Sequence, residues 1–239
     1  MPINLSNNQL NSLGTQFANQ KGIVTSGSII YLDAGIANSY PGSGTTWTDL
    51  GVSGFNGTLI NGPTFTTSNG GAIILDGSND YINTANFQYN YFTICLWVYP
   101  GSTQNTYADI LDASHTGNQN FNIQQNAANT NQYEFAMIGA SSASSSGLFT
   151  LVSNTWTFLT FTWDNDKVRG YINGTIFGTG ASAASNFQSP FLRLGAWWGV
   201  GTVSRYWNGR YGAFYAYNRV LSGDEIYQNF DAQRQRYGI

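Results

Sequence analysis

Residues 209–239 read GRYGAFYAYNRVLSGDEIYQNFDAQRQRYGI, and this stretch decides the fold class. From Tyr211 to Tyr217, aromatic and small side chains alternate with the period of a β-strand. Side chains on both sides of the strand are apolar, so both faces are expected to be covered. Asn218 and Arg219 then turn the chain.

A short amphipathic helix is expected after that turn. Ser222 is placed to cap its amino end, and Glu225 stands three residues later, which completes a capping box. Leu221 and Ile226 can pack against each other across the cap, and Ile226 and Phe230 form one apolar stripe. The stretch therefore predicts a buried strand followed by a docked helix.

The chain from Ser28 onward consists of short apolar runs separated by glycine, asparagine, proline and serine, which is typical of strands and turns. No period of about 20 to 50 residues repeats, which disfavours a propeller or a solenoid. The pattern predicts an all-β protein, either a closed or a two-sheet antiparallel jelly roll. The predicted strands are 28–33, 71–76, 91–99, 107–112, 120–124, 132–138, 147–152, 155–163, 167–173, 175–178, 190–195 and 209–217.

Two hairpins can be placed from turn residues. Asp164, Asn165 and Asp166 separate two apolar runs, and the pair Asn173-Gly174 suits a type I′ turn.

Residues 1–27 differ from the rest and are predicted to be an amino-terminal arm, with the sandwich spanning residues 28–239. Leu10, Leu13 and Phe17 have helical spacing, so a short amphipathic helix that docks on a partner is one interpretation. A tail without fixed structure is the other.

Composition excludes several functions. The 239 residues are 41% hydrophobic and 15% aromatic but only 9% charged, so solubility must depend on neutral polar side chains. The net charge is −3, and Lys21 and Lys167 are the only lysines, which argues against nucleic acid as a partner. No signal peptide or membrane span is recognisable, so synthesis as a soluble cytoplasmic product is expected.

Five ordered blocks carry a resemblance to a known family. They are SIIYLDAGIANSYPGSGTTWTDL with FNGTLINGPTF, then GGAIILDGSNDYI, FTICLWVYP, NTWTFLTFTWDNDKVRGYINGTIFG, and FLRLGAW with GRYGAFYAYNRVLSGDEI. Together they resemble the laminin G-like branch of the concanavalin A-like lectin/glucanase superfamily, which implies a two-sheet jelly-roll sandwich. YLDAG, SYPGSGTTWTDL and the ending QRYGI resemble versions found in virion structural proteins of tailed phages.

Carboxylate catalysis is poorly supported. A glycosidase needs two carboxylates across the scissile bond. Glu134 and Glu225 are the only glutamates; the first has no acidic neighbour on its strand, and the second is explained as a helix cap. Asp164 and Asp166 belong to a hairpin tip.

Nucleophilic catalysis is no better supported. His115 is the only histidine and is expected in a solvated loop, while Cys95, the only cysteine, lies in an apolar run and is expected to be buried and unreactive. The sequence therefore predicts that the protein is not an enzyme.

The resemblance implies a calcium site in many family members, and Asp76, Asn79 and Asp80 form the best local cluster for one. The alternative is a tight turn in which these side chains cap their own backbone. Gly212 and Ala213 stand where the family often has acidic residues, which weakens the calcium interpretation.

A glycan site is predicted at Trp197, Trp198, Arg205, Tyr206 and Trp207. Adjacent tryptophans cannot face the same side of a strand, so at least one is expected to leave the core. Exposed aromatic faces stack on sugar rings, and arginines can bond hydroxyls. The alternative is that these side chains fill the core or a subunit contact.

Two functions are carried forward. In the first, the protein is a virion decoration or appendage on the virion surface: the arm attaches it to a capsid or tail protein, and the sandwich binds host or environmental glycans. In the second, it is a freestanding carbohydrate-binding lectin module. A homo-oligomer is compatible with either.

Overall fold

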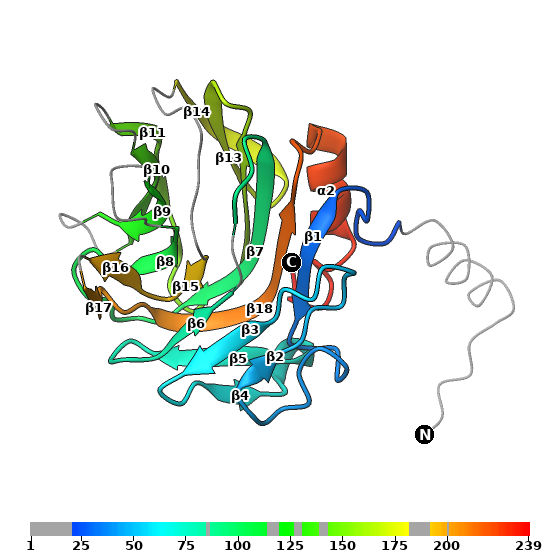
Figure 1. The fold of residues 1–239 in the computed structure, drawn as a ribbon, viewed down its shortest axis with the longest axis vertical. Coiled ribbons are helices and arrows are strands. Elements are labelled where there is room, and N and C mark those ends of the chain that lie inside the picture. Colours follow the sequence, from blue (N-terminus) through cyan, green and yellow to red (C-terminus); the bar gives the residue numbers. More distant parts are fainter. Residues whose placement is uncertain are drawn as a thin grey trace, which may run out of the picture.

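The computed structural model shows an all-β sandwich with one short helix near the carboxyl terminus (Figure 1). The structure describes residues 21–84, 87–113, 120–126, 131–138, 143–181, 192–199 and 201–239. Two large antiparallel sheets, here named A and B, contain eight strands each. This arrangement confirms the two-sheet form of the jelly roll.

Sheet A has the strand order β14-β13-β12-β7-β18-β5-β4, and β1 also pairs with β18. Its strands are β1 (Ser28–Asp33), β4 (Thr64–Thr66), β5 (Ala72–Asp76), β7 (Phe92–Pro100), β12 (Thr157–Trp163), β13 (Lys167–Ile172), β14 (Thr175–Ala181) and β18 (Asn208–Tyr217). A short 3₁₀ turn, η1 (Ser68–Gly70), joins β4 to β5.

Sheet B has the order β11-β10-β9-β8-β15-β6-β3-β2. Its strands are β2 (Thr46–Trp47), β3 (Gly57–Ile60), β6 (Tyr81–Asn83), β8 (Asp109–Asp112), β9 (Asn120–Gln125), β10 (Gln132–Ile138), β11 (Ala143–Thr150) and β15 (Arg193–Leu194). A separate hairpin consists of β16 (Trp197–Gly199) and β17 (Thr202–Ser204).

Strand β7 shows how sheet A is covered on both faces. Its Ile94, Leu96 and Val98 join the core between the sheets, while Cys95 and Trp97 belong to a second apolar cluster on the outer face. Side chains alternate along a strand, so one continuous apolar run serves two cores. The Cys95 thiol is free and buried as expected, and burial raises its pKa to about 12.

The helix α2 (Gly223–Asp231) covers the outer face of sheet A (Figure 1). Its capping box is formed as predicted: Ser222 Oγ accepts from Glu225 N at 3.2 Å, and Glu225 Oε2 accepts from Ser222 N at 2.9 Å. The sequence did not predict that Arg219 would bind the same carboxylate through two nitrogens, at 2.8 and 2.6 Å. The chain end also packs here, since the Tyr237 ring stacks on the Trp97 ring with 4.0 Å between the ring centroids.

The predicted boundary between arm and sandwich at residues 27 and 28 is too late. Val24 is buried in the outer cluster of sheet A, its N–H donates to Asn229 Oδ1 at 2.8 Å, and its carbonyl accepts from Tyr217 Oη at 3.0 Å. Residues 22–27 therefore pack with the sandwich. The predicted helix at residues 10–17 lies outside the described residues.

Both predicted hairpins are confirmed. Residues 164–166 join β12 to β13, with Asn165 at φ 68°. Asn173 and Gly174 have φ values of 50° and 79°, as a type I′ turn requires, and join β13 to β14.

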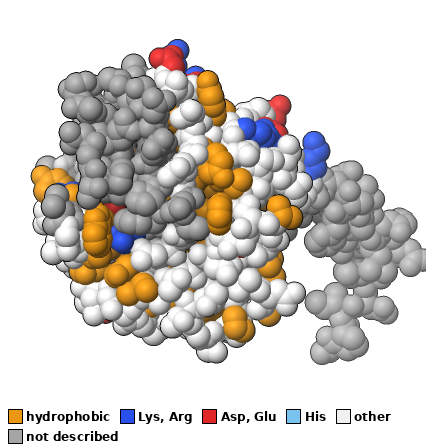
Figure 2. Space-filling model, in the orientation of Figure 1, with side chains coloured by type: hydrophobic (Ala, Val, Ile, Leu, Met, Phe, Trp, Pro, Cys, Tyr) orange, Lys and Arg blue, Asp and Glu red, His pale blue; other side chains and the backbone are white. Residues whose placement is uncertain are grey.

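The surface is mainly neutral, as composition predicted. Figure 2 shows mostly uncharged polar groups and backbone, with isolated hydrophobic side chains and few charges on the face in view. Among the described residues, no helix has the length and apolar character needed to cross a membrane.

Candidate functional site

The outer face of sheet B is polar, in contrast to the outer face of sheet A. Leu111, Ile123 and Phe135 of β8, β9 and β10 enter the core. Strand alternation places their neighbours on the opposite face. These polar neighbours are Asp112, Asn122, Gln124 and Glu134.

The β16–β17 hairpin lies against this polar face, on the left in Figure 1. It is tied to β8, because the Trp198 N–H donates to Asp112 Oδ2 at 2.9 Å. Trp197 and Trp198 are both partly buried, so part of each indole is accessible. The hairpin therefore places two aromatic side chains over a polar surface.

Each of these tryptophans packs on a different arginine. The Arg193 guanidinium lies 5.1 Å from the ring centroid of Trp198 and 5.1 Å from that of Tyr81. The Arg205 guanidinium lies 4.2 Å from Trp197 and 5.1 Å from Tyr107. Arginine over an aromatic face gains cation–π attraction, which fixes the orientation of both groups.

We name this surface the aromatic–arginine patch. Tyr206 completes it, with its ring 6.5 Å from that of Tyr81. The members of the patch are Tyr81, Tyr107, Arg193, Trp197, Trp198, Arg205 and Tyr206.

Two buried aspartates lie beneath the patch. Asp109 and Asp112 are almost fully excluded from solvent, and Asn122 Nδ2 donates to Asp109 Oδ1 at 3.1 Å. Burial raises the pKa of Asp109 well above its usual value, and the nearby Asp112 raises it further, while Arg205 opposes the shift. Asp109 Oδ2 has no hydrogen-bond partner among the described residues.

The sequence did not predict that two carboxylates would lie in one row across this face. Glu134 and Asp109 are both register partners of Gln124, so the three form one row across β10, β9 and β8. Gln124 Nε2 donates to Glu134 Oε1 at 2.6 Å. Because Asp109 is fully buried, this row does not present two carboxylates to a substrate, as glycoside hydrolysis requires.

The structure brings together four of the five predicted glycan residues, and Trp207 is the exception. Trp207 is fully buried in the core, where its ring lies 5.0 Å from that of Tyr211 and its indole N–H donates to Tyr133 Oη at 3.4 Å. The prediction for Trp207 is wrong, because a ring enclosed between the sheets cannot stack on a sugar. Sequence reasoning also missed Tyr81 and Tyr107, which come from distant segments.

The cluster proposed for calcium forms a tight turn. Asp76 Oδ1 accepts from the N–H groups of Ser78 and Asn79 at 2.7 and 3.3 Å, and Asp80 Oδ2 accepts from Asp76 N at 3.3 Å. The hydrogen bond from the Ser78 backbone leads the lowering of the pKa of Asp76. No group of three acidic, histidine or cysteine side chains suited to a metal occurs in the described ranges. These contacts favour the turn over the calcium site.

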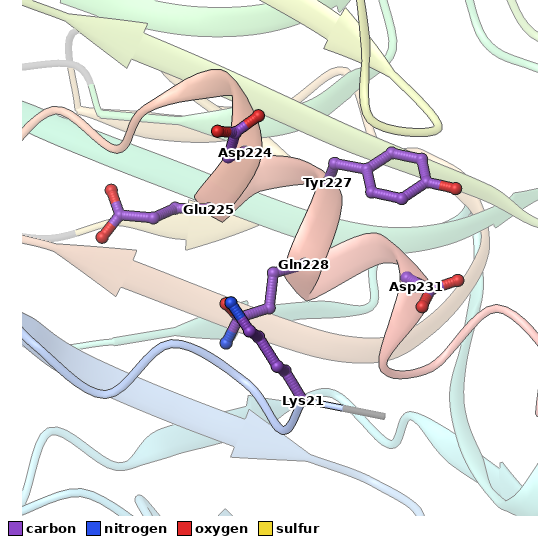
Figure 3. Close-up of a pocket in the computed structure, with 6 residues that line it drawn as sticks. All are labelled: Lys21, Asp224, Glu225, Tyr227, Gln228 and Asp231. Carbon is purple, nitrogen blue, oxygen red and sulfur yellow. The ribbon is translucent and has the colours of Figure 1, made fainter. Parts of the chain in front are cut away.

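A pocket of about 320 Å³ lies beside α2 but does not look like a functional site (Figure 3). The side chains of Asp224, Glu225, Tyr227 and Asp231 point away from α2 in different directions, and only Lys21 and Gln228 lie near each other in this view. Several are already engaged: Glu225 binds Arg219, Asp231 binds Arg234, and Gln228 Nε2 donates to the Gly22 carbonyl.

The sandwich and its polar outer face define a lectin-like class of β-protein. Residues 76–227 match the laminin G-type family model described as the concanavalin A-like lectin/glucanases superfamily. The chain therefore belongs to that superfamily. No curated protein matches the chain in sequence.

Several solved structures share the fold. Domain 4 of AbnA, a GH43 extracellular arabinanase from Geobacillus stearothermophilus in complex with arabinotriose, is similar with a TM-score of 0.68 and 18% identity, over 84% of this chain and 97% of that domain. The binding domain of botulinum neurotoxin DC in complex with SialylT has a TM-score of 0.68 and 17% identity, over 88% of this chain and 52% of that one.

The binding domain of Paraclostridial Mosquitocidal Protein 1 is a third example, with a TM-score of 0.65 and 16% identity, over 86% of this chain and 51% of that one. The chain thus spans about half the length of these two toxin domains. At such low identities, the likeness shows the fold alone.

Proposed function

We propose that this protein is a non-catalytic virion structural protein, a decoration or appendage of a tailed phage, whose sandwich binds glycans at the aromatic–arginine patch. The observation that carries the glycan part is the pair of arginine–aromatic stacks around Arg193 and Arg205. They gather partly accessible ring faces on one surface beside the guanidinium of Arg205, while Arg193, only 2% exposed, supports the rings from beneath.

The chemistry of the patch suits a sugar. Sugar rings stack through their C–H faces on aromatic rings, while their hydroxyls need hydrogen-bond partners. Trp197, Trp198 and Tyr107 offer ring surface, and Gln124 and Arg205, joined at 3.3 Å, offer polar groups beside it. Two similar structures, the AbnA domain and the neurotoxin DC domain, are described in complexes with arabinotriose and SialylT.

A binding role without catalysis is favoured by the state of the carboxylates. Asp109 is buried below the patch, and Glu134 is held by Gln124. The similar toxin structures are described as binding domains. Hydrolysis of a polysaccharide that disappeared in Glu134→Gln would overturn the non-catalytic part.

Display on a virion rests on the sequence resemblance of YLDAG, SYPGSGTTWTDL and QRYGI to tailed-phage virion proteins. In this proposal the amino-terminal arm attaches the sandwich to a capsid or tail protein on the virion surface. Because residues 22–27 pack with the sandwich, the attachment segment is residues 1–20. Deleting residues 1–20 should abolish incorporation into particles and spare glycan binding. Incorporation that survived the deletion would favour the alternative of a freestanding lectin.

A glycan array tests the binding site. The full chain, the double variant Trp197→Ala/Trp198→Ala and the control Tyr227→Ala should be compared on a broad array. Tyr227 is half exposed on α2, outside the patch, so its loss removes an accessible aromatic ring from another part of the surface. We expect saturable binding that falls at least about tenfold in the double variant and is unchanged in the control. A folded wild-type protein that binds no glycan would refute the proposal.

A further inference from the structure

A second pocket, of about 220 Å³, lies on the outer face of sheet A, whereas Tyr81 and Arg193 of the aromatic–arginine patch belong to strands of sheet B. Arg210 of β18 is the register partner of both Ile74 on β5 and Tyr99 on β7. Directly opposed residues project from the same face of a sheet, so the three side chains form one row. All three line the pocket.

Arg210 is held in position by aromatic packing. Its guanidinium lies 4.7 Å from the Tyr99 ring centroid, and the Tyr99 ring lies 5.3 Å from that of Trp156. A guanidinium stacked by its flat face keeps its N–H groups free at the edges. Tyr99 therefore orients the arginine without using its hydrogen-bond donors.

Arg210 has no protein counter-ion in the part of the chain that the structure describes. Arg169, Arg219, Arg234 and Arg236 form ion pairs with nearby acids, and Arg210 does not do so within this part of the chain. No acidic side chain lines the pocket. In a protein of net charge −3, this is a cationic pocket whose arginine forms no ion pair within the described ranges.

The rest of the lining is neutral and polar. Asn154 and Asn208 use their backbone N–H groups to bind Pro100 O at 2.8 Å and Gln104 Oε1 at 3.0 Å. Neither side-chain amide forms a hydrogen bond within the described ranges, and both line the pocket with Ser102. These three side chains can donate to, and accept from, hydroxyl groups.

We propose that this pocket binds the carboxylate of an acidic sugar, with Arg210 as the carboxylate receptor. The guanidinium fork matches a planar carboxylate through two parallel hydrogen bonds. The neutral amides and the hydroxyl beside it match sugar hydroxyls. The volume is below the roughly 300–1,000 Å³ of sites for drug-sized ligands, which suits a single sugar unit.

The pocket is independent of the glycan site proposed above, because it lies on the other sheet and shares no residue with it. The two ideas can therefore fail separately. A glucuronate site that persists in Trp197→Ala/Trp198→Ala would separate them directly.

Titration of the full chain, followed by ¹⁵N NMR at constant ionic strength, tests the proposal with sodium glucuronate, glucose and sodium sulfate as probes. We expect saturable shifts around Ser102 and Arg210 with glucuronate and none with glucose. Arg210→Gln and Arg210→Lys should each weaken glucuronate binding about tenfold or more, because lysine keeps the charge but lacks the fork. Arg169→Gln makes the same charge change far from the pocket and should leave the affinity unchanged.

Three results would overturn the proposal. The first is the absence of saturable shifts with glucuronate, and the second is unchanged glucuronate affinity in both Arg210 variants. The third is equal affinity for sulfate, which would make the pocket a general anion site without preference for an acidic sugar.

Discussion

Replacement of Glu225 by glutamine should expose how much the ion pair at the start of α2 stabilises the sandwich. Glu225 accepts two hydrogen bonds from Arg219 and one from the Ser222 backbone. Glutamine has nearly the same shape and keeps an oxygen for the Ser222 N–H, so the capping box is partly retained. The substitution therefore removes mainly the charge.

The magnitude follows from the carboxylate's environment. Hydrogen bonding to Arg219 lowers the pKa of Glu225 from 4.5 to about 2. If fully expressed in stability, this difference would correspond to about 3 kcal/mol, at roughly 1.4 kcal/mol per pH unit. The Arg219 and Glu225 side chains are 31% and 32% exposed, so solvent screens the pair and we expect about 1 kcal/mol.

The sign of the pH dependence is fixed by the lowered pKa. The contribution is complete above about pH 4.5 and is lost as the pH falls toward about 2, where the folded carboxylate becomes protonated. Urea unfolding of wild type and Glu225→Gln at several pH values measures it. The two proteins should differ by about 1 kcal/mol at pH 7 and converge near pH 2.

Asp224→Asn is the control, because it removes an acid from the same first turn that forms no ion pair within the described residues. Its cost should be a few tenths of a kcal/mol from the helix dipole. A Glu225→Gln cost equal to that of the control, or one that persists at pH 2, would show that the ion pair with Arg219 does not stabilise the fold.

Three further predictions concern the core, the buried acid and the metal. Trp207→Ala should lower the free energy of unfolding by about 3 to 5 kcal/mol. Trp198→Ala should cost less than half as much, because of the two side chains only that of Trp207 is fully buried. Similar urea midpoints for the two variants would contradict the core placement of Trp207. Asp109→Asn should raise the free energy of unfolding at pH 7 and have little effect at pH 3. The pKa of Asp109 is raised in the folded protein, so above about pH 3.8 the ionisation of this carboxyl group favours the unfolded chain. A variant that is destabilised at pH 7 would show that the fold needs the charge. The melting temperature should be the same in calcium and in chelator, because the Asp76 carboxylate already caps a turn; a higher melting temperature in calcium would restore the metal site.

Local patterns predicted the parts of the fold that depend on near neighbours. The capping box at Ser222 and Glu225 is formed, and Asn173-Gly174 adopts the φ values of its turn. Twelve strands were predicted, and each overlaps an observed strand; 28–33 and 132–138 match in both bounds. These features follow from propensities that act over a few residues.

Six strands were not predicted: β2, β3, β4, β6, β16 and β17. All are two to four residues long. A segment of this length shows too few alternations for a period to be recognised. These strands exist because neighbouring strands supply hydrogen-bond partners, and in the β16–β17 hairpin Trp198 lies opposite Val203.

The candidate site was only partly predictable for the same reason. The tryptophan pair and Arg205 lie close in sequence and were recognised together. Tyr81 and Tyr107 reach the patch only because the strands and loops of sheet B come together from distant segments. The burial of Trp207 also depends on the opposite sheet, and no pattern within residues 193–210 distinguishes it from Trp198.

The strand periods, the turns and the helix cap can be predicted from the sequence, because each is encoded in residues that are near one another along the chain. The family resemblance is recognisable for a related reason, since each of its blocks is a contiguous segment. Which side chains share a face depends on how the strands assemble. Arg193 pairs in register with Asn83 on one side and Asp112 on the other, and these partners are remote in sequence. A shift of one residue in that register would turn every side chain to the opposite face, so the polar face of sheet B is a property of the assembled sheet.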